Sequence, residues 1–232
     1  MQENSSVCGK IEATHTFNHH LAIIASCLMV EISTLMNISH KSIKLDDGSK
    51  PCSCTKLLEL LSALKIEHKT VSHEAMFTVA QSKSLRKTNP HGGYTKNLFV
   101  RNKKGVMWLI TCNEDRRIDL KALAAAMGYV GSNGRFSFAS EDRLGRHLCV
   151  SPGAVSPLAL INDTENLVQF AIDISLLDYD VIHLHPLDNY HTTTISVQDL
   201  IQFAEYTGHK PARLEFDPVS YTHLTLPTIL LV

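Results

Sequence analysis

Three short stretches of the sequence combine residue types that could act on a small polar substrate. The first is a loop, residues 149–157, in which Pro152 and Pro157 bracket Gly153. Each proline fixes its φ angle and lacks an N–H, and glycine adopts backbone angles that cost other residues energy. Such a loop is stiff, and its remaining N–H groups can stabilise an oxyanion. An ordinary connection between a helix and a strand is the alternative interpretation.

The second and third stretches supply a cation and an imidazole. Lys96 stands at the start of a strand pattern, and its ammonium group suits a phosphate. His185 ends another strand pattern, where its ring could exchange a hydrogen bond or orient water. We expect Lys96, His185 and the Gly153 loop to meet at one place. A histidine that is satisfied inside the fold is the alternative for His185.

The sequence indicates neither a conventional nucleophile nor a complete metal site. It has no Gly-x-Ser-x-Gly elbow, and Cys149 is a lone cysteine of the kind that usually packs. Two histidine sets lack a second pair of ligands: His15 with His19, and His183 with His185 and His191. We therefore expect no metal and no cofactor.

The charge distribution is more informative than the net charge. The 232-residue chain has a net charge of −1, so no global field favours a nucleic acid. However, no acidic residue occurs between Glu74 and Glu114, and that window holds Lys83, Arg86, Lys87, Lys96, Arg101, Lys103 and Lys104. A local basic face suits a partner with few phosphates, such as the end of a nucleic acid or a nucleotide, although a solvated face explains it equally well.

Two features of the sequence bear on the cellular compartment of the protein: its cysteines and one apolar run near the N-terminus. The six cysteines form no CxxC pair, which favours free thiols in a reducing compartment. The run from Leu21 to Val30 is too short to span a bilayer, and Glu3 and Glu12 precede it where a signal peptide would be basic. We expect a cytoplasmic protein that does not enter a membrane.

Periodicity and capping residues predict a mixture of helices and strands. The expected helices are 55–64, 78–87, one capped by Asp119, one capped by Ser140, and 197–207 capped by Ser196; the expected strands are 68–72, 96–101, 106–112, 135–139, 158–161, 167–172, 181–185, 191–195 and 212–216. The pairs 96–101 with 106–112, and 158–161 with 167–172, are predicted to be hairpins. This order favours an α+β fold with a mixed, largely antiparallel sheet over a doubly wound one.

The pattern also predicts domain limits. Residues 1–52 are expected to be an extension that is poorly ordered or not native, and residues 53–217 a single domain. The final segment, 218–232, adds apolar residues after the natural end of the domain, so we interpret it as a translated cloning or sequencing adaptor.

Four motifs occur in a fixed order along the chain: Gly92–Phe99 (GGYTKNLF), Phe136–Ala139, Pro152–Pro157 followed by Leu158–Asp163, and His185-Pro-Leu187 with Thr192–Ile195. Together they resemble the YbaK/ProX family of aminoacyl-tRNA editing domains. The resemblance covers about residues 55–217. It implies a curled mixed sheet flanked by helices, and hydrolysis of the ester in mischarged tRNA, most closely that of Ala-tRNA(Pro).

The resemblance also implies roles for individual residues. Lys96 matches the lysine that contacts the terminal adenosine of tRNA, and His185 matches the histidine of a Phe-His-Pro motif. Gly153 belongs to a GxxxP loop facing the aminoacyl group. These three are the expected catalytic residues; the expected substrate-binding residues are Thr95, Asn97, Ala154, Val155, Ser156 and Pro157. The partners implied are the acceptor end of tRNA(Pro) and the translation machinery.

Three positions depart from the family pattern and bear on amino-acid preference. Tyr94 replaces a common histidine, Leu184 replaces the phenylalanine, and Asn189-Tyr-His191 replaces smaller residues. The alternatives are a deacylase for another small amino acid and a tRNA-binding module without catalysis. A zinc-dependent alanyl editing protein would need HxxxH with CxxxH, of which only His15 and His19 offer half.

Overall fold

The computed structural model describes residues 51–75, 92–131 and 134–216. The chain divides into two compact units, Met1–Ser42 and Ile43–Val232, and all described residues belong to the second. The expected helix 78–87, the extension up to residue 50 and the tail from 217 lie outside the described residues. No helix within the described ranges is long and apolar enough to cross a membrane.

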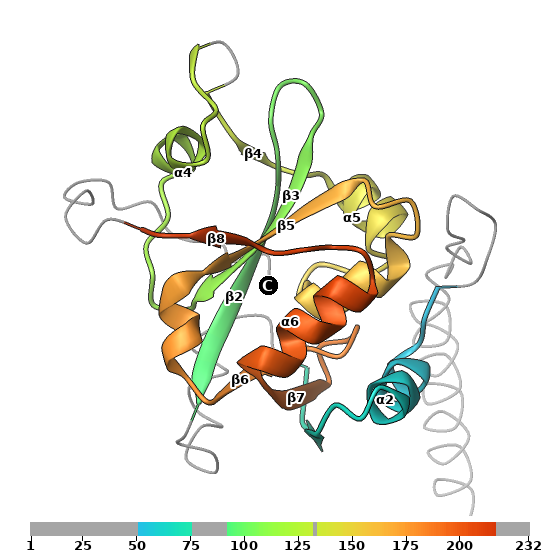
Figure 1. Ribbon diagram of the computed structural model, residues 1–232. Helices are drawn as coiled ribbons and strands as arrows, with labels where there is room; N and C mark the ends of the chain where they lie inside the picture. Colours follow the sequence, from blue (N-terminus) through green and yellow to red (C-terminus); the bar gives the residue numbers. More distant parts are fainter. Residues whose placement is uncertain (1–50, 76–91, 132–133, 217–232) are drawn as a thin grey trace, which may run out of the picture. The chain divides into compact units, whose positions relative to one another are not determined.

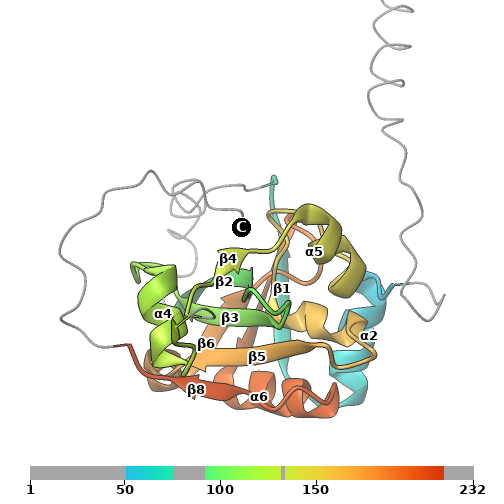
Figure 2. The same ribbon diagram turned by 90° about the horizontal axis from the view of Figure 1, so that it is seen from above.

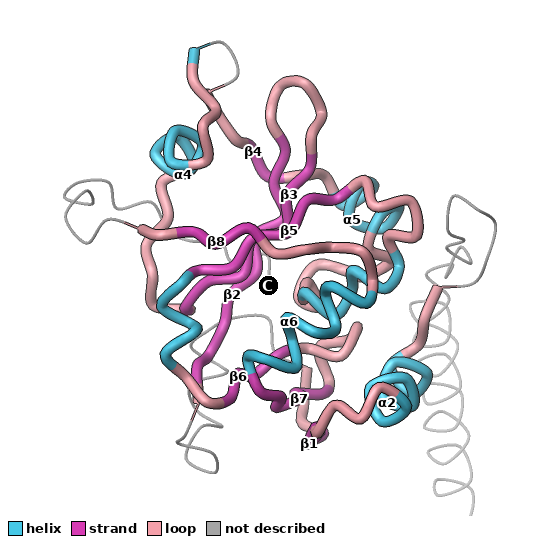
Figure 3. Tube along the Cα trace, viewed as in Figure 1, coloured by secondary structure: helices cyan, strands magenta, loops and turns pink. Residues whose placement is uncertain are grey.

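Eight strands form one mixed sheet (Figures 1 and 3). They are β1 (His68–Ser72), β2 (Gly93–Arg101), β3 (Met107–Asn113), β4 (Ser137–Phe138), β5 (Val168–Asp173), β6 (Val181–Leu184), β7 (His191–Ser196) and β8 (Ala212–Leu214). The order is β1-β7-β6-β2-β3-β5-β8, and β4 also pairs with β2. Four of the seven pairings are antiparallel and three parallel. The predicted α+β fold with a mixed sheet is confirmed.

The helices begin where capping residues satisfy their first N–H groups. They are α2 (Cys54–Ala63), α4 (Leu120–Ala126), α5 (Glu141–His147) and α6 (Val197–Tyr206), with two short 3₁₀ helices, η3 (Pro157–Asn162) and η4 (Ile174–Asp178). The predicted caps Asp119, Ser140 and Ser196 each accept from an N–H of the first turn. Ser53 caps α2 in the same way.

Two apolar clusters lie on opposite faces of the sheet, as the alternation of side chains along its strands requires. The larger cluster includes Phe99 of β2 and packs against α2, α5, η3 and α6. The smaller cluster includes the neighbouring residues Leu98 and Val100 and packs against α4 and the segment after β8. Figure 2 shows α4 well separated from α2 and α6.

The predicted strand 158–161 is wrong, and with it the second hairpin. These residues belong to η3, because Ser156 accepts from the Leu158 N–H and Pro157 occupies the first helical turn. β5 pairs instead with β3, in parallel. The predicted strand 135–139 is reduced to the two residues of β4.

Candidate active site

The candidate site lies where one edge of β2 is open. β3 pairs with β2 from Thr95 to Arg101 along one edge. The other edge pairs with β6 only at Gly93 and Tyr94, and with β4 only at Val100 and Arg101. Thr95, Lys96 and Asn97 therefore lie in a stretch of β2 that has a strand partner on one edge only.

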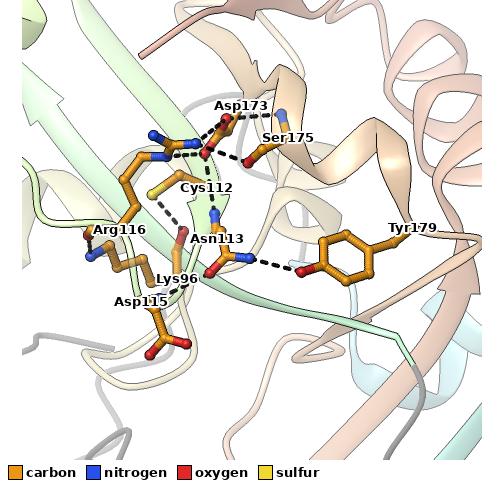
Figure 4. Close-up of polar contacts among 8 residues, drawn as sticks. All are labelled: Lys96, Cys112, Asn113, Asp115, Arg116, Asp173, Ser175 and Tyr179. Atoms are coloured by element: carbon orange, nitrogen blue, oxygen red, sulfur yellow. Dashed lines mark hydrogen bonds and ion pairs between the residues drawn. The ribbon is translucent and has the colours of Figure 1, made fainter. Parts of the chain in front are cut away.

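Lys96 lies on the face of the sheet that carries the smaller apolar cluster. It is buried, and Nζ donates to the backbone carbonyl of Arg116 (Figure 4). Cys112 stands opposite it on β3, and the Cys112 thiol donates to the Lys96 carbonyl at 3.7 Å. Burial lowers the pKa of Lys96 and raises the pKa of Cys112 to about 12, so the thiol is uncharged.

The buried carboxylate of Asp173 holds in place the segment around Arg116, whose carbonyl accepts from Lys96. Asp173, fully buried at the end of β5, accepts from Arg116 Nε at 2.5 Å and from Arg116 Nη2 at 3.3 Å. The same guanidinium donates to Ser175 Oγ at 3.1 Å and lies 4.8 Å from the ring of Phe216. Such a bidentate pair restricts the backbone of Arg116, and with it the carbonyl that accepts from Lys96.

The loop 149–157 is a defined turn. The Ala154 N–H donates to the Ser151 carbonyl at 3.0 Å, and Gly153 has φ +96°. Proline followed by glycine with positive φ is typical of a type II turn, which a residue with a Cβ adopts only under strain. Within the described part of the chain, the N–H groups of Gly153 and Val155 donate to no protein acceptor. This turn keeps two donors for another group, while the predicted stiffness of the loop stays a prediction.

Asn97 holds this loop against β2. Its Nδ2 donates to the Val155 carbonyl at 2.9 Å, and its Oδ1 accepts from Thr111 Oγ1 at 2.8 Å. All three residues are buried. The structure therefore shows Asn97 supporting the loop, while the predicted contact between Asn97 and substrate stays a prediction.

His185 directly follows β6 and is half-buried. Its Nδ1 lies 3.0 Å from the carbonyl oxygen of His191, which only accepts, so Nδ1 carries the proton and Nε2 keeps a lone pair. Burial lowers the pKa of His185 below its ordinary 6.5, and nearby His73, with ring centroids 6.4 Å apart, lowers it further. At neutral pH, His185 therefore presents an uncharged imidazole.

The two glycines that begin the GGYTKNLF motif make room for aromatic rings. A Cβ on Gly92, where φ is +121°, would lie 2.6 Å from His183 Nε2. A Cβ on Gly93 would lie 2.8 Å from the ring of Tyr179, whose hydroxyl accepts from Asn113 Nδ2 at 3.3 Å. Tyr94, a departure from the family pattern, stacks on His183 with centroids 4.5 Å apart.

The structure brings some predicted site residues together and separates others. Asn97 contacts the loop, and Thr95 Oγ1 donates to the His183 carbonyl at 3.0 Å, linking β2 to β6. Lys96 points away from Val155, because adjacent strand residues face opposite sides of the sheet. The joint action of Lys96 and the Gly153 loop therefore stays a prediction.

The predicted basic face is not a single patch among the described residues. Lys103 and Lys104 lie at the exposed tip of the β2–β3 hairpin. They are separated from Lys96 by about 20 Å of extended strand, at roughly 3.3 Å per residue. Lys83, Arg86 and Lys87 lie outside the described residues.

Sequence reasoning did not identify the groups that position the site. These groups are Arg116, Asp173, Thr111 and His73. Each contacts a candidate residue, or a partner of one, that is distant from it in the sequence. Strand alternation could have assigned Lys96 and Asn97 to opposite faces. No local signal could have paired Arg116 with Asp173.

Comparison with known proteins supports the resemblance that the four sequence motifs indicate. The family model described as "Aminoacyl-tRNA editing domain" matches residues 73–203. Prolyl-tRNA synthetase associated domain-containing protein 1 of Bos taurus is 37% identical over 69% of this chain and 94% of its own length. The chain belongs to the aminoacyl-tRNA editing domain family. Prolyl-tRNA editing protein ProX of Acetoanaerobium sticklandii is 33% identical over 64% of this chain and 88% of its own.

A solved structure shares the fold of this editing domain. The crystal structure of a candidate trans-editing enzyme for prolyl tRNA synthetase matches with a TM-score of 0.53 and 16% identity, over 72% of this chain and all of that one. The matched range of the editing domain family includes Lys96, the Gly153 loop and His185. The resemblance on which their roles were predicted is therefore a family relationship.

Proposed function

We propose that this chain is a deacylase that hydrolyses the ester of mischarged aminoacyl-tRNA, with Ala-tRNA(Pro) as its substrate. Membership of the editing family carries the proposal, because the family match spans the residues with suitable chemistry. The name of the ProX relative refers to prolyl-tRNA editing, which favours tRNA(Pro).

In the proposed reaction, water attacks the carbonyl carbon of the ester. The bond from this carbon to the ribose oxygen then breaks, and the ribose oxygen takes a proton, leaving free alanine and intact tRNA. No protein nucleophile is required, because the ester is already labile and the protein supplies position and charge stabilisation.

Each predicted residue has a separate role in this reaction. The N–H groups of Gly153 and Val155 donate to the oxyanion that forms at the carbonyl. His185, uncharged at neutral pH, accepts a hydrogen bond at Nε2 from the attacking water or a ribose hydroxyl. Lys96 neutralises charge at the 3′ end of the tRNA, for which Nζ must leave the Arg116 carbonyl.

Selectivity for alanine over proline would come from size. Val155, Ala154 and Pro157 are buried around the loop, so the space beside it is restricted. A small pocket excludes a larger side chain strongly, whereas it cannot exclude a smaller one. The editing site therefore accepts alanine, which a synthetase built for proline fails to reject.

The test is loss of the ester from purified aminoacyl-tRNAs. We expect the full chain to hydrolyse Ala-tRNA(Pro) and to leave Pro-tRNA(Pro) intact. Faster hydrolysis of Ser-tRNA or another small aminoacyl ester would support the alternative of a different amino acid. Binding of tRNA without hydrolysis of any of these esters would favour an inactive module and contradict the proposal.

A further inference from the structure

A cluster of metal-binding side chains lies beside the candidate active site. Cys54, Asp188 and His191 offer one sulfur, one oxygen and one nitrogen, all within 4.8 Å of one another. His191 Nδ1 lies 2.9 Å and 3.0 Å from the two Asp188 oxygens, and the Cys54 thiol also forms a hydrogen bond to Asp188. All three residues are half-buried, so solvent ions can reach them.

The donor set selects a class of ion. Calcium and magnesium take oxygen ligands, whereas thiolate and imidazole suit zinc and related transition ions. Zinc is bound by sulfur, nitrogen and carboxylate oxygen in tetrahedral geometry. We propose that Cys54, Asp188 and His191 bind a zinc-type divalent ion and leave its fourth position open to water or another ligand.

The observed spacing is close to what zinc requires. Tetrahedral bonds of about 2.0–2.3 Å place ligand atoms about 3.3–3.8 Å apart. No pair of ligand atoms in the cluster has to approach by more than about 1 Å, and the His191–Asp188 pair must open slightly. Rotations of half-exposed side chains are enough for both changes.

The ion would replace protons that the cluster already shares. In the metal-free protein the Asp188 carboxylate accepts from both the thiol and the imidazole. On binding, Cys54 releases its proton, and the proton of the neutral His191 ring moves from Nδ1 to Nε2, so that Nδ1 can bind the ion. Burial and the neighbouring Asp188 raise the pKa of Cys54 to about 11, and this opposes binding. Direct coordination deprotonates a thiol even so.

The proposed ion would link parts of the fold that are far apart in the sequence. Cys54 is the first residue of α2, whereas Asp188 lies between β6 and β7 and His191 begins β7. The sequence-based expectation of no metal considered His191 only with His183 and His185. In the structure, His183 Nδ1 faces Thr194 Oγ1 and His185 Nδ1 faces a carbonyl. The proposal does not depend on editing activity.

The test measures metal binding to the full-length chain. We expect one Co²⁺ to bind with a thiolate charge-transfer band, and Zn²⁺ to displace it. Cys54→Ser should abolish the band, and Asp188→Asn and His191→Gln should each weaken Zn²⁺ affinity by at least about tenfold. Cys52→Ser is the matched control, because Cys52 is also a half-buried thiol but is not in the cluster.

A second measurement needs no variant. Zn²⁺ should protect Cys54 from alkylation in the wild-type chain, as read by mass spectrometry of the labelled peptide, and should not protect Cys52. Equal alkylation of Cys54 with and without Zn²⁺ would overturn the proposal. An unchanged charge-transfer band in folded Cys54→Ser, which retains Cys8 and Cys27, would also overturn it.

Discussion

At the scale of single residues, Lys96 is the group whose charge the proposed function uses most directly. Lys96→Ala removes a charge-assisted interaction, so kcat/KM for Ala-tRNA(Pro) hydrolysis should fall about 10- to 100-fold, the equivalent of about 1.4–2.7 kcal/mol. Lys103→Ala, at the exposed hairpin tip, should leave kcat/KM unchanged. Single-turnover assays on folded variants measure both. Undiminished turnover in Lys96→Ala would remove the assigned role.

His185 should make the pH–rate profile of the reaction fall at acidic pH, and this falling part is called the acid limb below. Because the pKa of His185 is lowered from its ordinary 6.5, the neutral ring persists below that pH and is lost only at more acidic pH. After subtraction of spontaneous hydrolysis, kcat/KM should be constant near neutrality and decline in this acidic range. His73→Gln removes a positive neighbour and should move the limb to higher pH. An identical limb in His185→Asn would show that another group titrates.

At the scale of elements, Asn97 connects the open stretch of β2 to the loop. Asn97→Ala leaves the Val155 carbonyl and the Thr111 hydroxyl unpaired in the interior, at a cost of about 2–4 kcal/mol in the free energy of unfolding. Deacylation should fall as well, because the loop donors lose their position. Urea unfolding and the ester assay measure the two effects.

Thr111→Val is the matched control for Asn97. It removes only the bond from Thr111 Oγ1 to Asn97 Oδ1 and should cost about 1–3 kcal/mol. Because Asn97 still holds Val155, the variant should retain most of its activity. Equal activity losses in Asn97→Ala and Thr111→Val would contradict a specific role for Asn97 in placing the loop.

Elements defined by local chemistry were predictable from the sequence. Asp119, Ser140 and Ser196 cap helices because their side chains reach N–H groups two or three residues ahead. The four-residue apolar run 158–161 was assigned wrongly, because such a run does not distinguish a strand from a short helix. The ion pair of Arg116 with Asp173 depends on tertiary contact, which no local pattern encodes.

At the scale of the whole molecule, we propose that the domain predicted at residues 53–217 begins two residues earlier, at residue 51. The Cys52 N–H donates to Asn162 Oδ1 at 2.8 Å, and Phe216 is buried, so both ends belong to the fold. A chain of residues 51–217 should keep the melting temperature of the full protein within a few degrees. Thermal unfolding followed by circular dichroism provides the measurement.

Shortening this chain further should be costly. Ending it at Leu214 removes the buried Phe216 and its contact with Arg116, a loss of about 2 kcal/mol. For a domain of this size, that loss lowers the melting temperature by about 4–8 °C. If the chains 51–214 and 51–217 had the same melting temperature, Phe216 would contribute nothing to the stability of the fold.

β2 pairs with β6 over only two of its residues, so the sheet has fewer backbone hydrogen bonds there than between β2 and β3. Within the described residues, Gly93 and Tyr94 form the single strand pairing between the group β1, β7 and β6 and the other strands. Rotation of one group against the other would break few backbone hydrogen bonds there, whereas separation of β2 from β3 would break a ladder of seven residue pairs. Because the larger apolar cluster includes Phe99 of β2 and Ile182 of β6, side-chain packing rather than backbone pairing holds these two groups of strands together.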